Sequence, residues 1–239
     1  MSQKYVIVTG GSKGIGKSII EKSVMDGFLP ICVSRSPYEG VLSDKVVSIL
    51  CDLSDSDGVR HCFAELDARS IVANYLVNNA GALVGKRLHA LTLDEIDLQI
   101  HMNTRLPILM CREFLIRLGA GGSLSSGVII SISSLSALSI SSDTVYGAAK
   151  AAVTGLTRCL ASHYAPHIRV NAVAPGFIPS TDMGAKVPRD RAKSYIDNSL
   201  TKKELKPDAV AEMVSFLMSD KAVNITGVTY EVCNGSYLR

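Results

Sequence analysis

Residues 5–20 decide the fold, and they read YVIVTGGSKGIGKSII. The apolar, mostly β-branched start predicts a buried strand, and the apolar residues spaced three and four apart after the glycines predict a helix. Gly10, Gly14 and Gly16 fit a tight turn whose backbone can approach a phosphate, because a helix N-terminus supplies free N–H groups and a positive dipole end. A glycine-rich turn is weak evidence alone, but its place between strand and helix predicts dinucleotide binding.

The same alternation of strand and helix continues along the chain. Short apolar runs at residues 30–34, 46–50, 75–77, 127–133, 168–174 and 227–232 suit strands that are covered on both faces, and residues 16–26, 56–69 and 144–164 have helical spacing. We therefore predict an α/β fold of the Rossmann type, a doubly wound parallel sheet with helices on both faces. A chain of 239 residues that is 47% hydrophobic can bury one core, so residues 1–239 are expected to form a single domain.

Composition argues against several classes of function. A net charge of only +3 gives no reason to expect a nucleic-acid partner, and no apolar run approaches the ~20 residues that cross a bilayer. The N-terminus runs directly into a strand, so we expect a soluble, unprocessed protein. The six cysteines and five histidines are scattered, which favours reduced thiols in a cytoplasmic protein without a metal site.

Two segments read as loops. The Gly/Ser-rich residues 119–127 are expected to link a helix ending near Leu118 to the fifth strand. Residues 175–191 form a second, long loop with three prolines after the sixth strand. Because ligands bind at the carboxyl edge of such a sheet, we expect a substrate loop at about residues 176–206.

The spacing of the glycine turn resembles that of the short-chain dehydrogenase/reductase family. Further motifs occur in the family's order: CDLSD at 51–55, NNAG at 78–81, Asn103, ISS at 132–134, YGAAK at 146–150 and VNAVAPGFI at 170–178. The resemblance spans essentially the whole chain. It implies an oxidoreductase similar to single-domain carbonyl reductases and 3-oxoacyl-carrier-protein reductases, assembled as a dimer or tetramer through the helices near residues 106–118 and 144–164.

The second strand ends in VSRS, which bears on the cofactor. A carboxylate at this place binds the adenosine ribose hydroxyls, whereas an arginine accepts a 2′-phosphate. Here the place is taken by Arg35, and the resemblance puts Lys13 beside the same phosphate, so we predict NADP(H). The alternative is that both are merely solvated charges, and Glu39 lies too far into the loop to act as the acid.

The resemblance also implies other cofactor contacts. Asp52 is expected to bind the adenine amino group with Leu53 packed near the ring, and Asn79, Ala80 and Gly81 to pass close to the nicotinamide ribose. The predicted cofactor-binding set is completed by Gly10, Ser12, Lys13, Gly14, Ile15, Gly16, Arg35, Tyr146, Lys150, Pro175, Gly176, Ile178 and Thr181.

Tyr146 and Lys150 lie four residues apart and so share one face of a helix that Ser142 or Asp143 is expected to cap. A nearby ammonium and an oxidised nicotinamide favour phenolate, which would bring the pKa of the tyrosine toward the range of a general acid–base. By resemblance Lys150 also binds the nicotinamide ribose. Without the other motifs the pair would be an ordinary amphipathic spacing.

Ser134 is the predicted serine that donates a hydrogen bond to the substrate oxygen. The usual family interval before the tyrosine would instead select Ser133, and side-chain alternation makes the two mutually exclusive. Asn103 resembles the family residue that holds a water of the proton relay behind Lys150. These four residues, Asn103, Ser134, Tyr146 and Lys150, are the predicted catalytic set.

Two places depart from the family pattern. The hydroxyl that bonds the nicotinamide carboxamide falls on Ser180, with Thr181 directly after it, and either could serve. The usual aspartate-diglycine near the C-terminus is replaced by CNG at residues 233–235.

The substrate is the least determined feature. The pocket is expected between Leu83 and Val84, residues 135–138, Asp143 and the loop at 177–191. Four cations in or near that loop could attract an acidic substrate or carrier, although such runs are more often a solvated helix face; they are Lys186, Arg189, Arg191 and Lys193. We predict an NADPH-dependent carbonyl reductase. The alternatives are a specific 3-oxoacyl-carrier-protein reductase and a catalytically silent NADP(H)-binding sensor.

Overall fold

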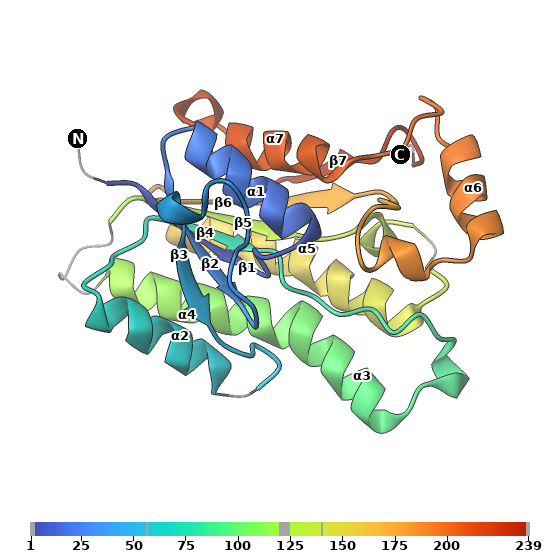
Figure 1. Cartoon of the computed structure of the whole chain (residues 1–239), viewed down its shortest axis with the longest axis horizontal. Coiled ribbons are helices and arrows are strands. Elements are labelled where there is room, and N and C mark those ends of the chain that lie inside the picture. The colour runs from blue at the N-terminus through green and yellow to red at the C-terminus, as the bar shows by residue number, and fades with distance from the viewer. Residues whose placement is uncertain (1–2, 56, 120–124, 140, 238–239) are drawn as a thin grey trace.

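Seven parallel strands form one sheet in the order β3-β2-β1-β4-β5-β6-β7 (Figure 1). The computed structural model describes residues 3–55, 57–119, 125–139 and 141–237. The strands are β1 (Tyr5–Thr9), β2 (Leu29–Ser34), β3 (Val47–Leu50), β4 (Tyr75–Asn78), β5 (Gly127–Ile132), β6 (Ile168–Pro175) and β7 (Thr229–Val232). The predicted doubly wound parallel α/β fold is confirmed.

Helices cover both faces of the sheet. The helices are α1 (Gly14–Met25), α2 (Gly58–Ala68), α3 (Leu93–Ile100), α4 (Leu106–Leu118), α5 (Thr144–Tyr164), α6 (Arg189–Asp197) and α7 (Pro207–Met218). Figure 1 shows α1 and α7 on one face and α2, α4 and α5 on the other, with α6 at the far end beyond the sheet. This is the three-layer arrangement that right-handed crossovers produce.

Alternate residues of each strand feed two separate cores. In β1, Ile7 belongs to the core under α2 and α4, whereas Val6 and Val8 belong to the core under α1 and α7. The same split occurs in β4, where Leu76 lies in the first core and Val77 in the second. Continuously apolar strands are needed for this, because side chains on both faces are removed from water.

Most predicted boundaries agree with the structure to within two residues. The helix predicted at 144–164 is α5, and α4 ends at Leu118 as expected. The start of α1 at Gly14 differs from the predicted start at residue 16, since the last part of the glycine turn already has helical geometry. Of the predicted link at 119–127, residues 120–124 lie outside the described residues.

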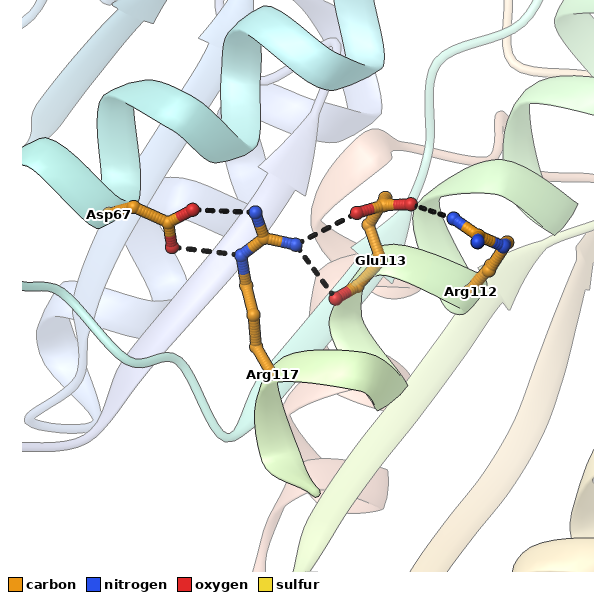
Figure 2. A network of polar contacts seen from close by, with 4 residues as sticks. All are labelled: Asp67, Arg112, Glu113 and Arg117. Carbon is orange, nitrogen blue, oxygen red and sulfur yellow. Dashed lines mark hydrogen bonds and ion pairs between the residues drawn. The ribbon is translucent and has the colours of Figure 1, made fainter. Parts of the chain in front are cut away.

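A network of ion pairs joins α2 to α4 on the surface (Figure 2). The guanidinium of Arg117 in α4 donates to both carboxylate oxygens of Asp67 in α2, at 2.9 and 2.6 Å, and to Glu113 at 2.9 Å. Glu113 also pairs with Arg112. Arg117 lies 4.6 Å from the ring centroid of Phe63, so its stem and head cover the edge of the core.

Candidate active site

The predicted site residues gather at the carboxyl edge of the sheet, where β1 and β4 lie side by side. From β1 the chain winds outward through β2 and β3, and from β4 it winds the other way through β5, β6 and β7. Loops at such a switch point diverge and leave a crevice, which is where doubly wound sheets bind nucleotides.

The glycine turn leads from β1 into α1. Gly10 and Gly14 have φ values of +66° and +50°, which L side chains rarely adopt. A Cβ on Gly16 would lie 2.1 Å from the carbonyl oxygen of Gly10, so no larger residue fits there. The helix has no side-chain cap and no acidic residue in its first turn. Its N-terminal dipole is therefore left for an anionic ligand.

Thr9 ties the glycine turn to the loop that follows β4. Its Oγ1 accepts hydrogen bonds from the backbone N–H groups of Asn79 at 2.9 Å and Ala80 at 3.0 Å. The Nδ2 of Asn79 donates back to the carbonyls of Thr9 and Gly10, at 2.9 and 3.1 Å. Two loops that are about 70 residues apart in sequence are thus held as one unit by partly buried polar contacts.

Cations and hydroxyls lie around the ends of β1 and β2. Arg35 is exposed directly after β2, and Ser36 donates to Ser12 of the glycine turn at 3.3 Å. Lys13 is also exposed and forms an ion pair of 3.6 Å with Asp182 of the long loop. Both predicted phosphate-binding cations therefore project into solvent beside the turn.

Asp52 and Leu53 follow β3 at the same edge. A side-chain hydrogen bond from Ser54, at 2.6 Å, chiefly lowers the pKa of Asp52, and the charge of Arg35 acts in the same direction. Leu53 is buried, and its carbonyl oxygen lies 2.9 Å from His101 Nε2. Asp52 is thus an exposed carboxylate whose negative charge is stabilised by the positive charge of Arg35.

Tyr146 and Lys150 lie one turn apart near the start of α5. The ammonium of Lys150 lies 5.8 Å from the centroid of the Tyr146 ring and donates to the carbonyl oxygen of Ile132 at 2.8 Å. Lys150 is only 4% exposed, and burial lowers its pKa from 10.5 to about 8. An ammonium held by one carbonyl in a dry environment is ready to bind further oxygen acceptors.

The pKa of Tyr146 lies above its ordinary value. Burial raises it, the hydrogen bond with Ser134 lowers it, and the charge of Asp143 raises it again. In the protein alone, desolvation of the phenolate outweighs the favourable contact, whereas the expected lowering depends also on an oxidised nicotinamide and stays a prediction. The phenol is set up as a proton donor.

The two candidate serines have separate surroundings. Ser134 follows the residue after β5, and its hydroxyl accepts from Ser136 N at 3.1 Å. It lies near enough to the phenol of Tyr146 to lower the pKa of that group. Ser133 is 2% exposed and donates to the backbone carbonyl of Lys150 at 3.0 Å. The structure thus brings Ser134 beside Tyr146, while Ser133 supports the helix from beneath.

Asn103 lies in a π-helical turn, His101–Arg105, between α3 and α4. It is fully buried, and its Nδ2 donates to the carbonyls of Ala82 at 2.7 Å and Gln99 at 2.9 Å. A Cβ on Gly81 would lie 2.7 Å from Asn103 Oδ1 and 3.4 Å from Lys150 Nζ. Gly81, Asn103 and Lys150 are therefore neighbours. Single π-helical turns inside helices occur frequently at functional sites.

The end of β6 brings the long loop over the glycine turn. Gly176 N donates to Val232 O at 2.9 Å, and Ile178 is buried. Thr181 hydrogen-bonds Ile178 O and Gly184 N, both at 3.0 Å, and its methyl group would lie 3.4 Å from a Cβ on Gly14. Ser180 is exposed. Of the two candidate hydroxyls, Thr181 is the one that faces the turn.

The carboxylate of Asp143, which was expected to line the substrate pocket, is instead hydrogen-bonded to backbone N–H groups. Its Oδ1 accepts from Tyr146 N at 3.0 Å, so Asp143 rather than Ser142 caps α5, and its Oδ2 accepts from Gly85 N at 2.9 Å. The carboxylate is 4% exposed. Both oxygens are occupied by backbone donors, and none is turned freely toward a substrate.

A small hollow elsewhere in the loop region does not coincide with the chemistry. It lies between Phe177, Tyr195, Lys203 and Cys233, and neither Ser134, Tyr146 nor Lys150 lines it. Phe177 and Tyr195 contact each other there with ring centroids 5.2 Å apart, which joins the end of β6 to α6. We therefore do not place the substrate in it.

The sequence did not predict three positioning contacts. They are made by Thr9 with the loop after β4, by Gln99 with Val84 N, and by Asp143 with Gly85 N. Gln99 is fully buried in α3, accepts from Val84 N at 3.4 Å, and has an Nε2 without a partner among the described residues. A signal existed only for Thr9, a polar residue that ends an apolar strand at the glycine turn. The other contacts join segments with no local pattern.

The described parts of the chain hold neither a cluster of metal-ligating side chains nor a helix that could span a membrane. No group of three or more metal-ligating side chains comes together among residues 3–55, 57–119, 125–139 and 141–237. Over the same residues, no helix has the length and apolar character that crossing a membrane requires.

Known proteins resemble this chain along its length. A family model described as enoyl-(acyl carrier protein) reductase matches residues 34–236. The chain is 32% identical to L-xylulose reductase of Caenorhabditis elegans, over 98% of this chain and 96% of that protein. It is 30% identical to the 3-oxoacyl-[acyl-carrier-protein] reductase of Vibrio harveyi, over 98% of each.

A solved structure agrees with the fold. The short chain dehydrogenase of Leptospira borgpetersenii, with bound NAD+, matches 100% of this chain and 94% of its own with a TM-score of 0.90 and 24% identity. At that identity the likeness shows the arrangement of the sheet and helices.

Proposed function

Because the chain belongs to the short-chain dehydrogenase/reductase family, and is thus an oxidoreductase acting on CH–OH or C=O groups, we propose that it is an NADPH-dependent carbonyl reductase. One observation carries the proposal. Ser134 acts on the pKa of Tyr146, and the Lys150 ammonium lies 5.8 Å from the centroid of the Tyr146 ring, at the sheet edge where the glycine turn also lies.

The residues of the turn fit a nicotinamide dinucleotide. A side chain at Gly16 would fill the cradle between the turn and the helix, and the uncapped start of α1 suits a pyrophosphate. Gly10, Gly14 and Gly16 would hold the pyrophosphate, Asp52 the adenine, and Lys150 the nicotinamide ribose. When bound, the nicotinamide supplies the hydride.

The protein supplies orientation and the proton. Ser134 donates a hydrogen bond to the substrate oxygen and stabilises the negative charge that grows there during reduction. Tyr146 gives its proton to the same oxygen, and its raised pKa keeps that proton available at neutral pH. The buried ammonium of Lys150 stabilises the phenolate that remains. Asn103 holds the surrounding loop, and by family resemblance a water of the proton relay.

The preference for NADP(H) rests on charge. Arg35 and Lys13 both project beside the glycine turn, and no carboxylate ends β2. Arg35→Asp should weaken NADPH binding by roughly 10- to 100-fold, because it removes the charge-assisted bidentate hydrogen bonds between the guanidinium and the 2′-phosphate. NADH, which has no 2′-phosphate, should lose far less affinity. The measurement is the Kd of each cofactor by fluorescence titration. Equal losses for both would overturn the assignment.

The activity is tested by following NADPH absorbance with ketones, quinones, 3-oxoacyl thioesters and 2-enoyl thioesters, using wild type and Tyr146→Phe. We expect reduction of at least one carbonyl and its loss in Tyr146→Phe. Full activity in that variant would contradict the mechanism, and reduction of enoyl thioesters alone would contradict the reaction class. Tight NADPH binding with no turnover would favour the silent sensor.

The substrate loop favours one second candidate, a 3-oxoacyl-carrier-protein reductase. Arg189 and Arg191 are exposed on α6 and make no ion pair within the described residues, whereas Lys193 pairs with Asp197. The relative from Vibrio harveyi acts on such a carrier-linked substrate by its name. Arg189→Glu with Arg191→Glu should raise KM for a carrier-linked thioester but not for the same acyl group on a small thiol. Equal KM changes would argue against a carrier.

We propose an oligomer built on α4 and α5. Ile108 and Ile116 of α4 are 44% and 50% exposed, which is unusual for isoleucines spaced two turns apart on a long helix. Light scattering coupled to gel filtration should give a dimer or tetramer. A monomer at micromolar concentration would contradict this assembly.

A further inference from the structure

Asp143 connects two parts of the candidate site that are 58 residues apart in sequence. Its Oδ1 caps α5 through Tyr146 N at 3.0 Å, and its Oδ2 holds Gly85 N at 2.9 Å. Its own backbone is fixed as well, since Ser141 Oγ donates to Asp143 O at 2.9 Å and Gly147 N to the same oxygen at 3.0 Å. The carboxylate is 4% exposed, hydrogen-bonded through both oxygens and three residues upstream of the tyrosine.

The loop after β4 is held at three points. Asn103 bonds both backbone groups of Ala82, Gln99 Oε1 accepts from Val84 N, and Asp143 accepts from Gly85 N. Asn103 and Gln99 are neutral and come from the α3–α4 side. Among the three, only Asp143 carries a charge, and only Asp143 also begins the helix that carries Tyr146 and Lys150.

Among the described residues, three polar side chains act on the phenol or ring of Tyr146. From its own helix Lys150 faces the ring, from the turn after β5 Ser134 meets the hydroxyl, and from the helix start Asp143 contributes the negative charge. The ammonium of Lys150 is turned to Ile132 O. The negative charge of Asp143 raises the pKa of the phenol, after the larger effects of burial and of Ser134.

We propose that Asp143 is a positioning residue that locks the loop Ala82–Gly85 to the start of α5 and holds a buried negative charge beside the backbone of Tyr146. Its effect on carbonyl reduction rests on the proposed function, whereas its effect on the phenol does not. The charge of Asp143 opposes loss of the Tyr146 proton. Reduction needs the protonated phenol, so Asp143 extends the pH range of reduction upward.

The first test is a titration of the protein without added cofactor. Tyrosinate absorbance is followed with pH in wild type, Asp143→Asn and Asp143→Ser, and each curve is subtracted from that of the same protein carrying Tyr146→Phe, because the chain has eight tyrosines. We expect the Tyr146 midpoint to move to lower pH in both Asp143 variants. A serine at position 143 still offers a hydroxyl oxygen that can cap α5. Asp143→Ser therefore provides the measurement if Asp143→Asn does not fold.

Gln99→Leu is the matched control, because it removes the hydrogen bond from Val84 N to an uncharged side chain and so loosens the same loop. It should raise KM for a substrate that wild type reduces, without moving the Tyr146 midpoint or the basic limb of the pH–rate profile. Asp143→Asn should raise KM and also shift that limb to lower pH.

An unchanged Tyr146 midpoint in both Asp143 variants, or an equal shift in Gln99→Leu, would overturn the inference. If the midpoint shifts but no carbonyl is reduced by wild type, the role of Asp143 stands and the proposed function fails. The two failures are therefore distinguishable.

Discussion

Replacing Lys150 by methionine should change how the stability of the protein depends on pH. Lys150 is 4% exposed, and burial lowers its pKa from 10.5 to about 8. Between those two pH values the unfolded chain carries a charged lysine while the folded chain carries a neutral one. The unfolded state then binds more protons, so the free energy of unfolding rises with pH across this window.

The size of the rise follows from the two pKa values. At about 1.4 kcal/mol per pH unit, the interval from 10.5 to about 8 corresponds to roughly 3 kcal/mol. This is a large part of the stability of a typical domain. Lys150→Met keeps the length and volume of the side chain, loses the hydrogen bond to Ile132 O, and cannot titrate.

The assay is urea unfolding followed by circular dichroism from pH 7 to 10.5, without added cofactor. Wild type should gain roughly 3 kcal/mol relative to Lys150→Met over this range. Tyr146→Phe is the control, because it removes the neighbouring titratable phenol and should preserve the gain. Parallel curves for wild type and Lys150→Met would refute the reasoning, since they would mean that Lys150 is solvated when folded.

Three further predictions concern packing and polar contacts. Thr9→Val should cost roughly 2–4 kcal/mol of unfolding free energy in urea titrations, because it strands the two backbone N–H groups that follow β4, while Thr9→Ser should cost little. Gly81→Ala should cost about 1–3 kcal/mol and reduce kcat, because its Cβ would lie 2.7 Å from Asn103 Oδ1; unchanged melting and kcat would contradict the packing. Arg117→Met should cost about 1 kcal/mol or less, with the loss shrinking in high salt; a salt-independent loss would point to packing rather than to the pair with Asp67.

The order of strands and helices along the chain could be predicted, because the spacing of apolar residues within each segment indicates its secondary structure. Val6, Ile7 and Val8 read as a strand without knowledge of their neighbours, and α5 was predicted over its full length from residues spaced three and four apart. The glycine turn is equally local, since Gly10, Gly14 and Gly16 impose their backbone geometry within one loop. Tyr146 and Lys150 share a face for the same reason.

The choice between adjacent candidates needed the structure. Alternation says that Ser133 and Ser134 point opposite ways but not which of them meets Tyr146. β5 ends at Ile132, and the chain then turns so that Ser133 supports Lys150 O while Ser134 reaches the phenol. The sequence likewise allows either Ser142 or Asp143 as the N-cap of α5. The hydrogen bond from Tyr146 N to the Asp143 side chain identifies Asp143 as the cap.

The sequence by itself determined the strand order along the chain, the phosphate-binding turn and the one-turn spacing of Tyr146 and Lys150, because these depend on backbone geometry within a few residues. Only the tertiary structure decided which distant side chains meet, such as Thr9 with the loop after β4 and Asp143 with Gly85. It also decided the direction in which the pKa of Tyr146 moves. Burial is a property of the packed molecule, and desolvation of the phenolate outweighs the favourable effect of Ser134 on the phenol.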